Sequence, residues 1–247
     1  MTGLRTATVG SSVDADLAGP VLWWRSPTPL RFVTSAVLGG GIGEGRWFLN
    51  ASVPADYART DPATHLGGVA ASFGLDGPGV GMLTAADVRR HRHRSDGGAE
   101  VLATVGLGWP TWAADLDGRT APRVGTVNLF VLVPERLGDA ALVNLVATVT
   151  EAKVQALVDL GVDGTGTASD AVAVACPVHG GDADPFGGPR SHWGARAARA
   201  TYAAVRDGAL DDEIAARAAG YHRVPRRPGR TSPFADRPLN GPDAPPT

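Results

Sequence analysis

The stretch GDAALVNLVATVTEAKVQALVDL, residues 138–160, shapes the expected fold because it predicts one long amphipathic helix. At about 100° per residue, its apolar side chains gather on one broad face. Lys153 falls near the middle of that face and is the one lysine among the 23 basic residues of the chain. An amine in an apolar stripe must reach solvent, pair with an anion or have a lowered pKa. Lys153 is therefore the first candidate for chemistry.

Short apolar segments rich in β-forming residues are found on both sides of this helix. They predict strands at 31–38, 46–53, 79–84, 100–107, 123–133 and 170–176. Further helices are expected at 61–73, at 84–92 and at 191–207, the last continuing over 210–219 after a break at Gly208. This order predicts an α+β single domain, with a mostly antiparallel or mixed sheet packed against two long helices.

The domain is expected to span residues 21–222, between a flexible segment 1–20 and a disordered tail 223–247 rich in proline and arginine. The net charge of −2 gives no reason to expect a nucleic acid or an anionic membrane as partner. No apolar run is expected to cross a membrane, and Cys176 is alone, so no internal disulfide forms. We expect a cytoplasmic protein, compatible with a homo-oligomer.

Three motifs favour structural roles. The glycine run 39–45 fits neither the dinucleotide nor the P-loop spacing, so it predicts a tight turn or a close backbone approach. His91 and His93 stand among four arginines, which favours a solvated basic helix end over a metal site. Cys176 ends an apolar strand near His179, where a buried thiol is the commoner role than a catalytic one.

Three hydroxyl-rich segments are more suggestive. They are 125–128 (GTVN), 148–153 (TVTEAK) and 164–170 (GTGTASD). Together they contain a lysine, two carboxylates and several hydroxyls. These groups can supply a base, a nucleophile or oriented water, and oxyanion donors, which is what hydrolysis of an acyl bond requires.

The same segments resemble the adenosylcobinamide amidohydrolase family of corrinoid salvage. The resemblance covers about residues 33 to 207 and rests on these blocks: SAVLGGGIG (35–43), NASVPADYARTDP (50–62), VGMLTAA (80–86), GTVNLFVLV (125–133), TVTEAKVQALVDLG (148–161), GTGTASDA (164–171) and GGPRSHWGARAARATY (187–202). It implies hydrolysis of the amide between the aminopropanol arm and the corrin ring's propionate, giving adenosylcobyric acid. The corrinoid is then the substrate, and neither a metal nor another cofactor is expected.

This interpretation gives a set of candidate residues. The catalytic candidates are Lys153, Glu151, Asp170 and Thr126; the substrate-binding candidates are Asn50, Thr84, Asn128, Thr148, Thr150, Thr167, Gly40 and Gly41. Lys153 is either a base with a lowered pKa or a cation that stabilises the oxyanion. Glu151 lies across the helix and is the alternative base. The nucleophile stays open.

Two other functions remain alternatives at this point. One is a corrinoid-binding protein without hydrolytic activity, and the other is an amidohydrolase of a different substrate. A macrocyclic substrate needs a wide cleft, to which Trp47, Trp109, Trp112 and Trp193 are candidate contributors, although core packing is the commoner role of tryptophan.

Overall fold

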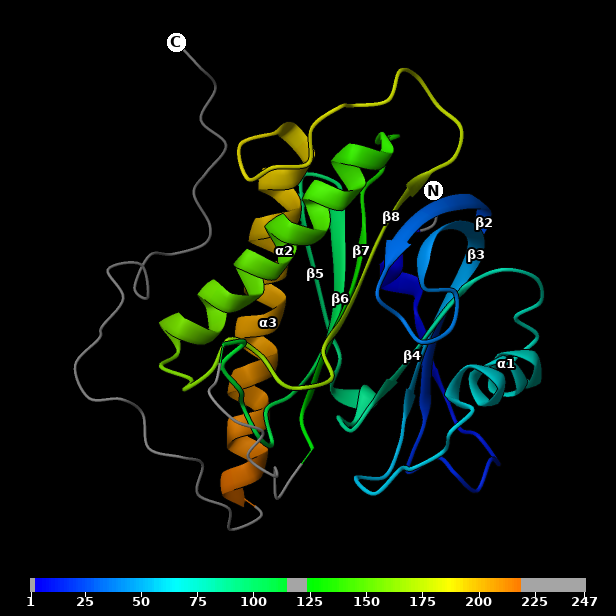
Figure 1. Cartoon of the computed structure of the whole chain (residues 1–247), viewed down its shortest axis with the longest axis vertical. Helices are drawn as coiled ribbons and strands as arrows, with labels where there is room; N and C mark the ends of the chain where they lie inside the picture. The colour runs from blue at the N-terminus through cyan, green and yellow to red at the C-terminus, as the bar shows by residue number, and fades with distance from the viewer. Residues whose placement is uncertain (1–2, 115–123, 219–247) are drawn as a thin grey trace.

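The computed structural model describes residues 3–114 and 124–218, with side chains through residue 213. Within these ranges one mixed sheet of eight strands packs with three α-helices (Figure 1). The strands are β1 (Thr8–Gly10), β2 (Val21–Thr34), β3 (Gly41–Ser52), β4 (Val80–Thr84), β5 (Arg92–Asp96), β6 (Ala99–Gly106), β7 (Thr126–Leu132) and β8 (Ala171–Pro177). The helices are α1 (Pro62–Ser72), α2 (Asp139–Asp159) and α3 (His192–Ala218). The predicted α+β fold is confirmed, and the short helix α1, predicted over 61–73, packs with the sheet beside the two long helices.

The strand order is β4-β3-β2-β8-β7-β6-β5, and β1 pairs with β2. Two neighbouring pairs, β3 with β4 and β7 with β8, are parallel, whereas the others are antiparallel. A parallel pair needs a crossover connection. Helix α1 makes the first crossover and α2 the second, which explains why the sheet is mixed.

The sheet curls strongly on itself. Phe48 on β3 stacks on Phe130 on β7 with ring centroids 4.4 Å apart, although β2 and β8 lie between these two strands in the sheet. Side chains so far apart in strand order meet only if the sheet bends round. A shift of register in β2 between Arg25 and Leu30 occurs within its pairing with β3, and such irregularities bend and twist strands. The inside of the curl is one apolar core.

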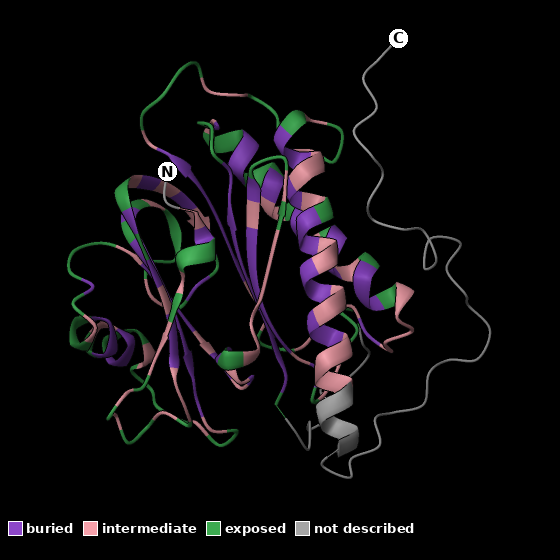
Figure 2. Ribbon diagram, turned by 180° about the vertical axis from the view of Figure 1, so that it is seen from behind, coloured by how far each residue is buried: buried purple, intermediate pink, exposed green. Residues whose placement is uncertain are grey.

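A second core lies between the outer face of the sheet and the two long helices. It joins alternate residues of β6, β7 and β8 to the inner faces of α2 and α3, and Figure 2 shows those faces as buried. By length and composition α2 meets the criteria for a membrane span, which the sequence did not lead us to expect. Half of that apolar window is buried against β2, β8 and α3, as in the core helix of a folded domain.

Several element boundaries differ from the sequence prediction. Strand β2 begins at Val21 and ends at Thr34, and the helix expected over 84–92 is replaced by a single 3-10 turn, Val88–Arg90, followed by β5. The basic residues 89–94 therefore lie in this 3-10 turn and in the edge strand β5, and not at the end of a helix. Helix α3 continues through Gly208 without the predicted break. A Cβ at this position would lie 2.7 Å from Val105, so glycine allows the helix to approach β6 closely.

The N-terminal segment contributes to the fold. Leu4 is fully buried in the core inside the curl, and β1 pairs with β2. Segment 1–20 therefore contains packed structure between residues 4 and 10. The tail predicted to be disordered, 223–247, lies outside the described residues.

Candidate active site

Lys153 forms a buried ion pair with Asp170. The Lys153 Nζ lies 2.5 Å from Asp170 Oδ2, and the two side chains are 8% and 12% exposed. Lys153 comes from α2, and Asp170 comes from the end of the loop that leads from α2 to β8. Of the three alternatives for an amine on an apolar face, Lys153 thus adopts pairing with an anion, and its Nζ donates a hydrogen bond to Asp170.

Asp170 is the centre of the loop that carries it. Its carboxylate accepts hydrogen bonds from the main-chain N–H of Val127 at 2.8 Å and of Thr167 at 3.2 Å. The Thr167 Oγ1 donates to Asp170 Oδ1 at 2.5 Å. One carboxylate therefore connects α2, the start of β7 and its own loop, which fixes the direction in which the Thr167 hydroxyl points.

Other hydroxyls adjoin this cluster at the Gly125 carbonyl. Thr167 Oγ1 and Ser169 Oγ both lie within donating distance of that oxygen, at 2.8 and 2.9 Å, and Ser169 Oγ is 3.0 Å from Thr126 Oγ1. The single proton of Thr167 is therefore shared between two acceptors, Asp170 and Gly125. Ser169 was not a candidate from sequence, although it lies within the hydroxyl-rich segment that contains Thr167.

A neighbouring network of buried amides joins the two halves of the curled sheet. Asn128 Nδ2 donates to Asn50 Oδ1 at 3.1 Å and to the Leu83 carbonyl at 2.8 Å, while Asn128 Oδ1 accepts from Ala171 N–H at 3.2 Å. Asn50 Nδ2 donates to Thr104 Oγ1 at 2.9 Å. Hydrogen bonds of Asn50 and Asn128 thus link five strands, which are β3, β4, β6, β7 and β8. Thr104 was also missed, because nothing local in its strand marks it.

Asn128→Leu is expected to lower the free energy of unfolding by roughly 3 kcal/mol, because it leaves several buried polar groups without partners. Urea denaturation measures this change. Asn144→Leu, on the exposed side of α2, is the matched control and is expected to change stability by less than about 0.5 kcal/mol. Equal stabilities of the two variants would contradict the role of the amide network.

The remaining candidates lie in separate environments. Thr84 is buried at the end of β4, next to Leu83, and its hydroxyl accepts from Ala86 N–H at 3.0 Å. Glu151 is exposed, and Thr150 donates to a carbonyl of its own helix. Thr148 donates to the Gly187 carbonyl at 2.9 Å and holds the segment before α3. The structure therefore brings Lys153, Asp170, Thr126 and Thr167 together, with Asn50 and Asn128 adjacent through Ala171.

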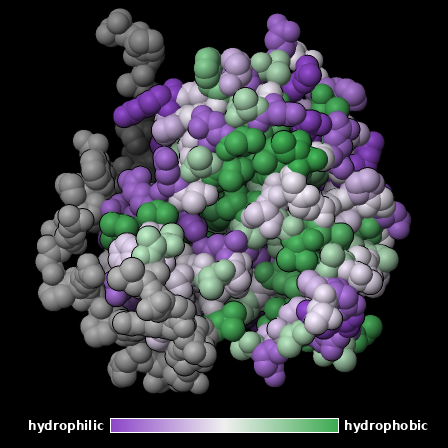
Figure 3. Space-filling view, viewed as in Figure 1, coloured by the Kyte–Doolittle hydropathy of each residue, from purple (hydrophilic) through white to green (hydrophobic). Residues whose placement is uncertain are grey.

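Gly40 lies in the loop between β2 and β3 and lines a pocket of about 350 Å³, whereas Gly41 is the first residue of β3 and is not part of that lining. Figure 3 shows apolar patches on the face of the molecule that carries α2 and the antiparallel pair β2 and β3. Trp47 lines the pocket with 3% of its surface exposed, whereas Trp193 is in the helix-side core and Trp112 is 39% exposed.

Two other groups with reactive potential have structural explanations. Burial raises the pKa of the Cys176 thiol, which suits the small buried residue predicted from sequence. Asp14, Asp16 and His65 lie within metal-binding distance of one another. Both ring nitrogens of His65 are engaged, however, with Tyr57 and Asp14, and the Arg59 guanidinium pairs with Asp16. These hydrogen bonds and the ion pair explain why the three side chains lie close together.

The hydroxyl of Thr167, the carboxylate of Asp170 and the amine of Lys153 form a chain of short contacts, an arrangement that can serve the hydrolysis of an amide. The family model described as adenosylcobinamide amidohydrolase matches residues 6–216, and the chain belongs to this family. A protein of Halobacterium salinarum named adenosylcobinamide amidohydrolase is 36% identical over 186 residues, covering 72% of this chain and 77% of its own. One of Methanosarcina mazei with the same name is 28% identical over 141 residues, covering 57% and 67%.

Proposed function

We propose that this protein hydrolyses adenosylcobinamide at the amide between the aminopropanol arm and the corrin propionate, giving adenosylcobyric acid and aminopropanol. The observation that carries the proposal is the joining of Thr167, Asp170 and Lys153 in one cluster, in a chain of this family. We propose that the corrinoid acts as substrate only, that no metal takes part, and that the protein works in the cytoplasm as part of corrinoid salvage.

In the proposed mechanism, Thr167 is the nucleophile. A nucleophile, a base within hydrogen-bond reach and a third group that orients the base form the arrangement used in covalent catalysis. The 2.5 Å contact between Thr167 Oγ1 and Asp170 Oδ1 supplies the first pair, and Lys153 supplies the orienting group. Lys153 is then a positioning residue and not the base considered from the sequence.

Asp170 takes the hydroxyl proton while Thr167 Oγ1 attacks the amide carbonyl carbon, and the carbon–nitrogen bond breaks as that proton passes to the departing amine. A water molecule then cleaves the threonyl ester, which releases the carboxylic acid and restores the hydroxyl. The neighbouring residues Ala168 and Ser169 are exposed, so a large substrate reaches this loop from outside.

The test is incubation of the purified protein with adenosylcobinamide, followed by mass spectrometry of the products. We expect adenosylcobyric acid and aminopropanol in equal amounts, at a rate unchanged by a metal chelator. Binding of the corrinoid without release of aminopropanol would instead identify a non-catalytic binding protein. Loss of activity with the chelator would overturn the metal-free mechanism.

A further inference from the structure

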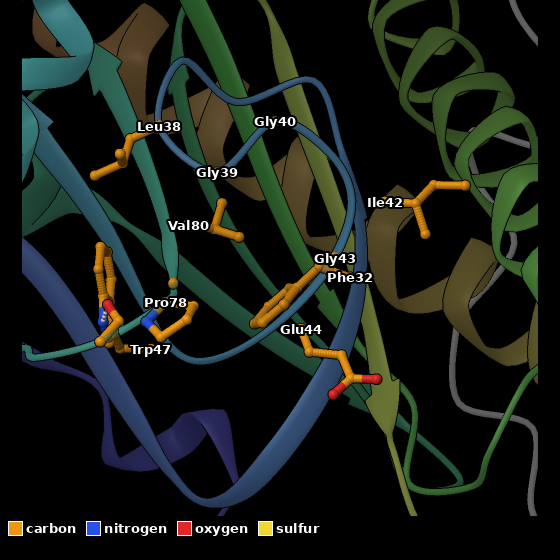
Figure 4. Close-up of a pocket in the computed structure, with 12 residues that line it drawn as sticks. Phe32, Leu38, Gly39, Gly40, Ile42, Gly43, Glu44, Trp47, Pro78 and Val80 are labelled. Atoms are coloured by element: carbon orange, nitrogen blue, oxygen red, sulfur yellow. Dashed lines mark hydrogen bonds between the residues drawn. The ribbon is translucent and has the colours of Figure 1, made fainter.

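The pocket beside β2 and β3 lies outside the catalytic cluster and has an unusual lining. The loop that contains Gly39 and Gly40 borders it, together with Phe32, Trp47 and Val80 (Figure 4). Main-chain atoms of glycines thus form much of its wall, and Leu38 and Ile42 add aliphatic side chains, whereas Phe32, Trp47 and Val80 are almost fully buried. Such a site offers apolar surface together with amide donors and acceptors, as small-molecule pockets commonly do.

Most of these glycines are required by close packing. A Cβ on Gly39 would lie 2.2 Å from the Gly79 carbonyl oxygen, one on Gly40 would lie 2.5 Å from the Ala36 carbonyl oxygen, and one on Gly79 would overlap the Trp47 ring. Gly39 also has a φ of +74°, which side chains disfavour. These three positions hold the walls of the pocket in place.

Gly43 has no such requirement. It lies in β3 opposite Phe32, its φ is not positive, and a Cβ there would meet no atom within 4 Å. Glycine weakens a strand interior and often marks a place where a ligand approaches the backbone. Gly43 lines the pocket, so the missing side chain leaves this part of the pocket open.

The lining indicates a neutral ligand. Among the described residues that line the pocket, the ionisable side chain is that of Glu44, which lies 3.5 Å from Arg31. Phosphate or carboxylate groups would find no cation in the lining. A volume of about 350 Å³ is near the lower end for small-molecule sites, which suits a nucleoside-sized group better than a whole macrocycle.

The pocket is connected to the catalytic cluster through the start of the same loop. Ser35 N–H donates to the Val172 carbonyl at 2.9 Å, and Val172 N–H donates to Ser35 Oγ at 3.1 Å. Val172 follows Asp170 by two residues, and Gly39 follows Ser35 by four. Four residues span at most about 14 Å of chain. In the proposed arrangement, one large substrate would occupy the pocket with one group and present an amide to Thr167 with another.

We propose that this pocket binds the adenosyl group of the substrate, with the flat neutral base against the backbone of the glycine loop. This assignment rests on the proposed function and adds to it a basis for recognising the adenosyl group. Gly43 is then a specificity-determining residue, because its missing side chain leaves room for the nucleoside.

The test compares Gly43→Val with the unaltered protein and two corrinoids, adenosylcobinamide and cobinamide carrying a methyl group in place of adenosyl. Equilibrium binding, followed by the visible absorbance of the corrin, gives a readout that does not depend on turnover. We expect Gly43→Val to weaken binding of adenosylcobinamide by at least about tenfold, since it inserts a side chain into the space of the ligand. Binding of methylcobinamide should change by less than about twofold, because that ligand leaves the pocket empty.

Gly68→Val on α1 is the matched control, because a Cβ there also meets nothing within 4 Å. Both variants should keep the thermal midpoint of the unaltered protein within a few degrees. Equal weakening for both corrinoids would assign the pocket to the corrin edge and overturn the adenosyl assignment, as would unchanged binding of both. If the unaltered protein binds both corrinoids but hydrolyses neither, the proposed function fails while the binding comparison still decides the role of the pocket.

Discussion

Thr167→Val is expected to lower kcat by at least about a thousandfold while leaving corrinoid binding within a few fold, because it removes only the proposed nucleophile. Valine has nearly the shape of threonine, so the loop keeps its packing and loses one hydroxyl. Thr167→Ser restores a hydroxyl at the same place and should keep kcat within about tenfold of the unaltered protein. Rates of aminopropanol release under single-turnover conditions measure these effects.

The matched control for this variant is Thr165→Val, two residues earlier in the same loop. The Thr165 hydroxyl accepts from Ala113 N–H at 3.0 Å and has no contact with Asp170, so kcat should stay close to that of the unaltered protein. Acid quenching of Thr167→Ser during turnover should also yield a peptide carrying the corrinoid acid as an ester. A Thr167→Val enzyme that keeps a tenth of the original kcat would exclude the nucleophile assignment.

The cluster at Lys153 was predictable because its residues are marked in the sequence. Lys153 stands alone in an arginine-rich chain and on the apolar face of a helix, and Asp170 closes a segment of glycines and hydroxyls. The structure also explains why arginine does not replace this lysine. A Cβ on Gly166 would lie 2.6 Å from Lys153 Nζ and 2.3 Å from Asp170 Oδ2, so the loop backbone leaves little space for a guanidinium.

The curl of the sheet was not predictable from local patterns. Asn50 and Asn128 are separated by 78 positions and lie on strands that are not neighbours in the sheet, yet their amides bond to each other. The alternation of apolar residues fixes which face of a strand is buried, but it does not say which distant strand covers that face. Thr104 is part of this network for the same reason, and no pattern in β6 distinguishes it.

Charge patterning misled the prediction of β5. Its arginines suggest a solvated surface, but they pair with acidic residues of α3 that come more than a hundred positions later: Arg94 contacts Asp207, and Arg92 contacts Asp211. Arg199 on α3 in turn pairs with Asp96 on β5 at 2.6 Å. Tertiary packing determines which acidic residues pair with the arginines of β5, and the local sequence does not reveal that packing.

Asp170→Ala is expected to lower the free energy of unfolding by about 3–5 kcal/mol, because it leaves the Lys153 ammonium buried without its partner. The Thr167 hydroxyl and the Val127 amide lose an acceptor at the same time. Lys153→Met should cost less, since Asp170 keeps its main-chain and hydroxyl donors. Urea denaturation of both single variants measures the difference.

The double variant Lys153→Met/Asp170→Leu separates stability from catalysis. An apolar pair of similar size avoids the unpaired buried charge, so the double variant should be more stable than Asp170→Ala, although the Val127 N–H and the Thr167 hydroxyl still lose Asp170 as acceptor. Activity should not recover, because the base is gone. Lys153→Arg keeps the charge but crowds Gly166, and should lose both stability and kcat. If Asp170→Ala unfolds as the unaltered protein does, the ion pair does not hold this loop, and the assignment of Lys153 as the residue that positions the base fails with it.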